Sequence, residues 1–317
     1  MRGPSPNDRT PDLFHLTPIG DEMTTQQLGS EIEIPYEDSY NENLTPGEDF
    51  ARCVASRTDE DEVVVPFHAY LPASFPLLKT RPRYMVRHLL KVGRVREGHG
   101  DYLEEFTRVD VAPSGIAYKA TPESTFGSAL RTAGFTDVEM ALNVPVEFVR
   151  KPGLLASFID YRMFVRMWTQ ENEILLYGSK DGAVEGLLNM KGLRTQSGRG
   201  DVFRALSLAA CEVEETGGSC DGIVIHPELY WLAAENGFLE RFKSAGVTVS
   251  RTRMMPRGSA LLGDFRAGAT LLNPNVSTLT LSKDPQAADR RIITARTRMG
   301  LAVHVPQHFV LHHHEED

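Results

Sequence analysis

Residues 152–178 read PGLLASFIDYRMFVRMWTQENEILLYG and predict one long helix from 153 to 177. Pro and Gly at its start and Gly178 at its end are residues that helix termini favour. About 25 residues at ~1.5 Å rise would span roughly 37 Å, longer than the usual helix of a globular domain. At 3.6 residues per turn, the stripe predicted to face the core comprises Leu154, Phe158, Tyr161, Val165, Trp168 and Asn172. The pattern is typical of a structural helix and not of an active site.

The composition is that of a soluble globular protein. Its 317 residues suffice for a large core, and the hydrophobic share of 41% and the charged share of 24% are ordinary. The formal net charge of −9 is spread along the sequence, without the clustered Lys and Arg that binding to nucleic-acid phosphates requires. We therefore expect no nucleic-acid partner.

The sequence shows no targeting signal and no disulfide-type cysteine spacing, which favours a cytoplasmic protein. No stretch of 18 apolar residues is present and the N-terminus is polar, so neither a membrane span nor a secretory signal is predicted. Cys53, Cys211 and Cys220 are odd in number and show no C-x-x-C spacing. This pattern argues against a disulfide framework or a thiolate zinc site and favours buried, reduced thiols. We expect no metal and no cofactor.

The first 46 residues form a distinct acidic segment. They contain six prolines and nine carboxylates, but only two arginines and few apolar residues in a regular period. Such a segment cannot bury enough apolar surface to fold alone. It is therefore predicted to be an arm, either disordered or laid across a neighbouring subunit. Residues 47–95 then read as helix, strand and helix, at 47–57, 62–70 and 84–92.

Two extended segments, 101–111 and 135–149, are predicted to pair as a long hairpin arm around a connection rich in Pro, Gly, Ser and Thr. In the second segment apolar and polar residues alternate, which is the period of a strand with one dry face. Pro145 confines this strand to a sheet edge. Its apolar face comprises Val138, Met140, Leu142, Val144 and Val146. A solitary apolar ribbon favours association, so we expect this face to contact a neighbouring copy of the chain.

The second half of the chain reads as short strands and helices. A Gly-rich loop at 192–200 leads to Asp201, a good N-cap for the helix that follows. An apolar strand at 223–225 turns through His226 and Pro227 into a helix at 228–235, whose end is marked by Asn236 and Gly237. The later strands are predicted at 247–250, 260–265, 268–272, 279–282, 291–305 and 309–311.

Reactive residue types gather in sequence around His226. Ser219, Cys220, Asp221 and His226 would suit a nucleophile–base arrangement. The nucleophile elbow G-x-S-x-G is absent from the sequence, and His before Pro at a helix start is commonly a cap. The three histidines at 312–314 could bind a metal ion, but a solvated terminal tail is not preorganised for one. Catalysis near His226 stays an alternative interpretation.

The order of these elements resembles the Hong Kong 97-type phage capsid fold, which encapsulins share. Two stretches carry the likeness. Residues 152–189 look like the spine helix and following loop of that fold, and residues 220–233, CDGIVIHPELYWLA, are similar to the start of its apical domain. The resemblance runs from Glu62 to Leu311 and implies an α+β fold. After the arm at 1–46, it implies a peripheral-domain region at 47–95, an extended loop at 96–149, the peripheral domain with its spine helix at 150–200, an apical domain at 201–290, and a closing strand with a C-terminal tail at 291–317.

The resemblance implies a shell-forming protein and not an enzyme. It favours an encapsulin nanocompartment of the extended N-arm type, an icosahedral homo-oligomer whose partners are its own copies and a separately encoded cargo enzyme. The short arm and the acidic chain favour this over a phage major capsid protein enclosing DNA. That alternative stays open, as do a cytosolic α/β enzyme and a small-oligomer binding module. The implied pore loop at a symmetry axis comprises Ala234, Glu235, Asn236, Gly237, Phe238 and Leu239.

Overall fold

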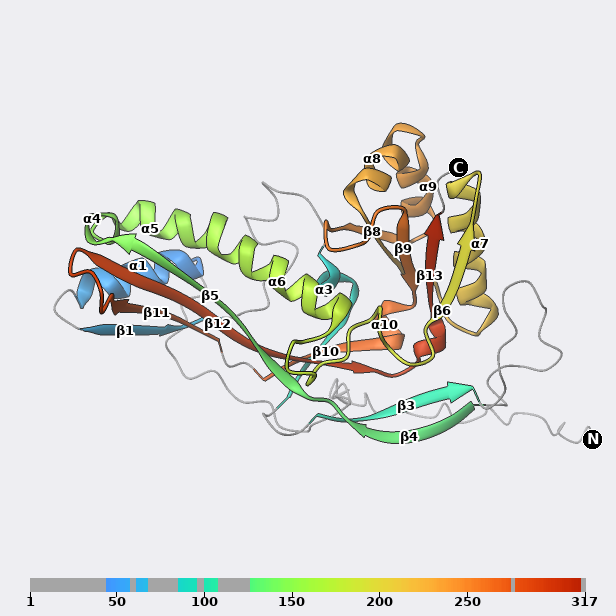
Figure 1. The fold of residues 1–317 in the computed structure, drawn as a ribbon, viewed down its shortest axis with the longest axis horizontal. Coiled ribbons are helices and arrows are strands. Elements are labelled where there is room, and N and C mark those ends of the chain that lie inside the picture. The colour runs from blue at the N-terminus through green and yellow to red at the C-terminus, as the bar shows by residue number, and fades with distance from the viewer. Residues whose placement is uncertain are drawn as a thin grey trace, which may run out of the picture.

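The computed structural model describes residues 44–57, 61–67, 85–95, 100–107, 126–274 and 277–314. Nearly all of the predicted arm at 1–46, and part of the predicted loop at 96–149, lie outside these residues. The described part consists of two sheets with helices packed on them and one separate two-stranded hairpin (Figure 1). This is an α+β architecture.

The larger sheet has six strands, and the long β12 (Arg290–Val303) lies at its centre. The strand order is β1 (Glu62–Pro66), β11 (Ser277–Lys283), β12, β10 (Ala269–Asn273) and β2 (Lys91–Arg94), and β5 (Phe135–Pro145) pairs along the other side of β12. β5 and β12 run antiparallel, from Arg290 opposite Pro145 to Gly300 opposite Phe135. β5 is thus an edge strand, where the missing N–H of a proline is harmless.

The predicted spine helix is present from Pro152 to Tyr177 and lies over one face of this sheet (Figure 1). It has three consecutive parts, which are α5 (Pro152–Phe158), a π-helical turn (Ile159–Met163) and α6 (Phe164–Tyr177). It ends at Gly178, whose φ of 90° is a conformation that side chains with a Cβ rarely adopt. Helix α1 (Pro46–Ser56) packs on α5, and the short α4 (Val146–Val149) leads into it.

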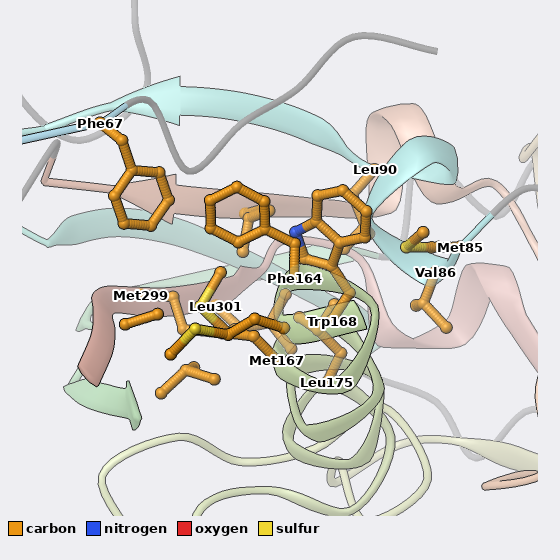
Figure 2. Packing of buried hydrophobic residues seen from close by; sticks show 14 of the residues in the cluster. Phe67, Met85, Val86, Leu90, Phe164, Met167, Trp168, Leu175, Met299 and Leu301 are labelled. Atoms are coloured by element: carbon orange, nitrogen blue, oxygen red, sulfur yellow. The ribbon is translucent and has the colours of Figure 1, made fainter. Parts of the chain in front are cut away.

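The main core lies between the spine helix and the six-stranded sheet. Figure 2 shows Phe164, Met167 and Trp168 of α6 close to Met299 and Leu301 of β12. The rings of Phe164 and Trp168 stack with centroids 5.8 Å apart. Buried aromatic side chains of this size contribute much of the hydrophobic stabilisation of a domain. The helix predicted at 84–92 is shorter than expected, because α3 (Val86–Leu89) gives way to β2.

The buried face of the spine helix differs from the predicted stripe. Trp168 and Asn172 are buried, but Phe158 and Val165 are only half-buried, and Leu154 is 54% exposed and Tyr161 36% exposed. The buried residues recur at steps of four, in two adjacent rows that comprise Leu155, Ile159, Met163, Met167, Glu171 and Leu175, and Ala156, Asp160, Phe164, Trp168, Asn172 and Leu176. In a straight α-helix each such step would rotate the row by about 40°. The π turn contains one residue more than an α-helical turn, so it rotates the two rows back until they face the sheet again. A uniform period of 3.6 residues cannot predict this correction.

The smaller sheet has five strands in the order β6 (Arg194–Gly198), β13 (Phe309–His314), β9 (Ser259–Gly263), β7 (Gly222–Ile225) and β8 (Thr248–Arg251). Its helices are α7 (Val202–Glu215), α8 (Pro227–Glu235) and α9 (Phe238–Ser244), and the short α10 (Phe265–Gly268) leads back to the larger sheet. The predicted cap at Asp201 is confirmed, because its side chain accepts hydrogen bonds from the backbone N–H groups of Phe203 and Arg204. The predicted strand–turn–helix unit is also present, as β7 and α8.

The two sheets divide the chain differently from the predicted ranges. β10 and β11 fall within the predicted apical range 201–290 but belong to the six-stranded sheet, whereas β6 and β13 fall outside it and belong to the five-stranded sheet. The 3-10 turn η3 (Pro306–His308) connects β12 to β13, so the predicted closing segment 291–317 passes from one sheet to the other. β13 lies between β6 and β9, and His312 on it is buried. The histidine run is therefore an inner strand and not the predicted solvated tail.

The predicted hairpin arm has a different second strand. β3 (Asp101–Thr107) pairs with β4 (Phe126–Thr132) and not with β5. The chain passes from β4 to β5 through Ala133 and Gly134, and a Cβ on Gly134 would lie only 2.2 Å from the carbonyl oxygen of Ala183. Glycine permits this close approach. The hairpin thus lies beside the six-stranded sheet, and β5 is part of that sheet (Figure 1).

Candidate functional site

The β3–β4 hairpin presents an apolar pair to solvent. Leu103 and Leu130 lie directly opposite each other in the register and are 42% and 76% exposed. Directly opposed side chains on one face of an antiparallel pair contact each other. Because an isolated two-stranded hairpin is at best marginally stable in water, this pair is suited to contact a further apolar surface. We call the outward face of the hairpin around Leu103 and Leu130 the hairpin face.

His304 holds the base of this hairpin against the larger sheet. Its Nδ1 lies 3.2 Å from the carbonyl oxygen of Leu103 and its Nε2 lies 2.9 Å from the hydroxyl of Thr270. The backbone N–H of Glu105 donates to the carbonyl oxygen of His304 at 2.7 Å, and the ring of Tyr102 meets the imidazole edge-on at 5.4 Å. Burial lowers the pKa of His304, so a neutral ring that donates from Nδ1 and accepts at Nε2 satisfies both contacts. These contacts attach β3 to the larger sheet, while the side chains of Leu103 and Leu130 stay exposed.

A polar cleft of about 360 Å³ separates the hairpin from the loop that follows the spine helix. Tyr102, Glu104 and Arg131 line it from the hairpin, and Glu185 and Lys191 line it from the loop. Glu104 accepts a hydrogen bond from Nε of Arg131 at 2.5 Å, and burial, with the Glu104 charge as the next cause, raises the pKa of Tyr102. The cleft thus contains charges of both signs.

The β5 residues predicted to contact a neighbouring copy pack in the core of the chain itself. Val138 and Val144 are buried, Met140 and Leu142 pack against the same core, and Val146 begins α4. β5 pairs with β12, so its apolar face is the face of the sheet that the spine helix covers. Val138 and Val144 are thus core residues, because β5 pairs with β12 and not with 101–111 as predicted. Charged residues at Leu142 or Val144 would therefore damage folding and could not test assembly. A contact of the half-buried Met140, Leu142 and Val146 with a neighbouring copy stays a prediction.

The six residues predicted to line a pore form one turn at the end of the five-stranded sheet's helices. Glu235 ends α8, Gly237 adopts a left-handed φ of 68°, and Phe238 begins α9. The ring of Phe238 stacks on Phe203 of α7 with centroids 4.6 Å apart. The turn is thus anchored on one side, with Glu235 and Asn236 exposed on the other. Its position at a symmetry axis stays a prediction.

The residues considered as catalytic candidates make contacts that stabilise the fold. The Nδ1 of His226 accepts from the backbone N–H of Glu228 at 3.2 Å, as expected of a cap. Asp221 accepts from the backbone N–H groups of Phe265 and Arg266, and burial raises the pKa of the Cys220 thiol to about 12. A thiol with this pKa is not a nucleophile at neutral pH. The prediction that all three cysteines are buried holds only for Cys220, because Cys53 is half-buried and Cys211 is exposed on α7.

The described residues form neither a cluster of three or more metal ligands nor a helix that could span a membrane. Within them, no three or more His, Cys, Asp or Glu side chains are placed to hold a metal ion. Of the histidine run, His312 and His314 have ring centroids 6.3 Å apart. None of the described helices has the length and apolarity of a membrane span.

The architecture is similar to that of solved particle and phage proteins. A virus-like particle from Pyrococcus furiosus matches with a TM-score of 0.52 at 12% identity, over 74% of this chain and 95% of that chain. A chain of Gordonia phage Cozz matches at 0.53 and 15% identity, over 73% and 86%. A chain of Mycobacterium phage Bobi matches at 0.53 and 13% identity, over 79% and 96%. No family model matches the sequence, and neither does any curated protein. At these identities the likeness shows the fold, which is the Hong Kong 97-type capsid fold.

The sequence did not predict that several apolar residues are exposed, among them Leu103, Leu130, Leu208 and Trp231. Leu130 lies in a stretch whose Gly and Ser content predicts a connection, whereas the structure has β4 there. Leu208 falls outside the buried row of α7 that contains Leu206 and Ala209, and a single exposed apolar residue of this kind is common on protein surfaces.

Proposed function

We propose that this chain is the subunit of a self-assembling protein shell. The observation that carries the proposal is the hairpin face, where Leu103 and Leu130 are opposed and exposed on a two-stranded ribbon that is separate from both larger sheets. The shared fold with the Pyrococcus furiosus virus-like particle supports it. In a closed assembly each hairpin face lies on a neighbouring copy, and such contacts, repeated by symmetry, add up to a stable particle.

Within this class we propose an encapsulin nanocompartment in the cytoplasm, which encloses a separately encoded cargo enzyme and admits small molecules at the loop 234–239. The net charge of −9 supports a protein cargo, because a container for DNA gains from neutral or basic inner walls. A phage major capsid protein is the second candidate, and the likeness to the two phage chains favours it.

Particle size tests the proposal. The full chain is purified and measured by light scattering and negative-stain microscopy, beside the double variant Leu103→Asp, Leu130→Asp and the matched control Leu103→Ile, Leu130→Val. We expect hollow megadalton particles from the wild type and the control, but not from the acidic variant, since burying a carboxylate without a partner is costly. A wild type that stays a single molecule at high concentration contradicts the shell. Particles from the acidic variant contradict the role of the hairpin face.

The contents of the particle separate the two candidates. We expect purified particles to contain a co-purifying enzyme, which mass spectrometry identifies. After nuclease has removed any nucleic acid outside the particles, their ultraviolet absorption spectrum should show no nucleic acid inside. Protected DNA would favour the phage capsid. For the loop 234–239, Glu235→Lys should alter cation entry into intact particles, because a ring of exposed carboxylates attracts cations.

A further inference from the structure

The histidine run of β13 lies on an inner strand, which changes what it can bind. A solvated tail is not preorganised for a metal ion, whereas a strand paired on both sides holds its side chains in fixed places. Side chains alternate between the two faces of a strand, so His312 and His314 share one face and His313 lies on the other. Val310, on the face of His312, belongs to the apolar cluster that includes the buried side of α7. His312 and His314 therefore lie on the α7 side of the sheet.

Two ring nitrogens on this face are buried and unpaired. Nε2 of His312 and Nδ1 of His314 have no hydrogen-bond partner among the described residues, and His312 is only 1% exposed. Buried polar side-chain atoms are nearly always paired, so each exception requires an explanation. The two rings have centroids 6.3 Å apart, so one small group could contact both nitrogens.

Small neighbours leave space beside these rings. Gly198 of β6 lies opposite His314 in the register, and on the other side the backbone N–H of His314 donates to the carbonyl oxygen of Gly258 at 2.8 Å. A Cβ on Gly198 would lie 3.5 Å from Cε1 of His312, the carbon between the two ring nitrogens. The neighbouring strands therefore place no long side chain beside His314.

Gln196 contacts the other ring nitrogen of His312. Its Nε2 lies 3.3 Å from Nδ1 of His312 and donates to the carbonyl oxygen of Ala205 on α7 at 3.3 Å. A glutamine amide has a donor and an acceptor, so by turning over it can instead accept from a protonated Nδ1. The lone pair at Nε2 of His312 is then free for an ion. Histidines that bind a metal commonly donate their second N–H to an oxygen in this way.

We propose that His312 and His314 form a site for one divalent transition-metal ion, held by Nε2 of His312 and Nδ1 of His314. Imidazole suits zinc, copper and nickel, whereas calcium and magnesium prefer oxygen ligands. Zinc lies about 2.0–2.1 Å from a histidine nitrogen, so two rings that share it have centroids roughly 5–6 Å apart. The observed 6.3 Å is close to this range, and a small rotation of the half-buried His314 ring closes the difference. Because the described residues contain no group of three metal ligands, water would occupy the remaining positions.

Zinc binding by single variants tests the site. The full chain, free of any affinity tag and stripped with a chelator, is titrated calorimetrically with zinc chloride and, in parallel, with magnesium chloride. We expect one zinc ion per chain and no binding of magnesium. His312→Leu and His314→Ala should each weaken zinc binding at least about tenfold, because each removes one of two protein ligands. The matched control His313→Ala should bind zinc as the wild type does, because His313 lies on the other face, with Nδ1 2.9 Å from the hydroxyl of Ser259.

Thermal melting separates a preorganised site from a mere run of histidines. The unfolded chain has the same three histidines, so zinc raises the Tm only if the folded chain binds it more tightly. We expect zinc to raise the Tm of the wild type and of His313→Ala, but not that of His312→Leu. Without zinc, His312→Leu should stay folded by circular dichroism, because leucine fills a buried position and removes an unpaired nitrogen.

The outcomes separate the metal site from the proposed shell. A wild type that binds no zinc, a Tm that falls with zinc, or an equal loss of binding in His313→Ala would each overturn the site. Binding is counted per chain, so a chain that binds zinc but forms no particle contradicts the shell alone. Particles that bind no zinc contradict the metal site alone.

Discussion

Asp160 gives the chain a pH-dependent stability that can be measured directly. It lies on the π turn of the spine helix and is buried. One carboxylate oxygen accepts from the hydroxyl of Thr45, and the other accepts from the backbone N–H of Gly47 at 2.9 Å. Thr45 is the N-cap of α1, so this single side chain joins the beginning of α1 to the spine helix.

The magnitude follows from the pKa of this carboxyl. Burial raises the pKa of Asp160 from 3.8 to about 6, against the hydrogen bonds from Thr45 and Gly47, which lower it. Because the pKa in the folded chain lies above that in the unfolded chain, the stabilisation is complete below pH 3.8 and is lost as the pH rises through about 6. At about 1.4 kcal/mol per pKa unit, a rise of about two units corresponds to about 3 kcal/mol.

Asparagine keeps the shape of this side chain and does not ionise. Its oxygen can accept from Gly47 and its amide can donate to the hydroxyl of Thr45. We expect Asp160→Asn to raise the free energy of unfolding by up to about 3 kcal/mol at pH 7.5 and to match the wild type closely at pH 4, in urea titrations followed by tryptophan fluorescence. As a control, Asp181→Asn should gain nothing at pH 7.5, because hydrogen bonds from Ser179 and Ala183 lower the pKa of that carboxyl. An equal gain at both pH values would refute the reasoning.

Two further substitutions test the core and a close backbone contact. Glu171→Ala removes the buried carboxylate that lies 3.3 Å from Nε of Arg87, and urea titration should show a loss of about 3–5 kcal/mol, whereas the exposed Glu173→Ala on the same helix should be near neutral. Equal losses would contradict a buried ion pair. Gly134→Ala places a Cβ 2.2 Å from a backbone oxygen and should cost about 1–3 kcal/mol in a thermal melt. Gly153→Ala, with no atom within 4 Å, should gain up to about 1 kcal/mol, and a loss there would contradict the reasoning.

Features set by local chemistry could be predicted from the sequence. Pro152 marks the start of the spine helix because proline fits the first helical turn, and Gly178 marks its end because glycine readily adopts a positive φ. Asp201 and His226 cap helices through contacts with residues two or three positions ahead. None of these depends on a distant part of the chain. The fold class could be predicted because the order of such elements resembles a known fold.

Features set by distant partners could not be predicted. Nothing within 135–145 says whether β5 pairs with β3 or with β12, since its alternation of apolar and polar residues suits either partner. Because β5 pairs with β12, Val138 and Val144 are core residues of this chain and not residues that contact another copy. The π turn is equally invisible, because it follows from the fit between the spine helix and the sheet. The sequence therefore predicts the alternation of β5 but not the strand with which it pairs.

The attachment of the hairpin explains how one contact can orient a whole subunit. His304 lies where β12 leaves the six-stranded sheet, and its backbone N–H and that of Val305 both donate to the carbonyl oxygen of Gly268. η3 and β13 follow at once, so the same few residues join both sheets and hold Leu103 and Glu105 of the hairpin. The hairpin direction is thereby fixed relative to both sheets. In the proposed shell, a neighbouring copy laid on the hairpin face would therefore also set the orientation of both sheets relative to itself.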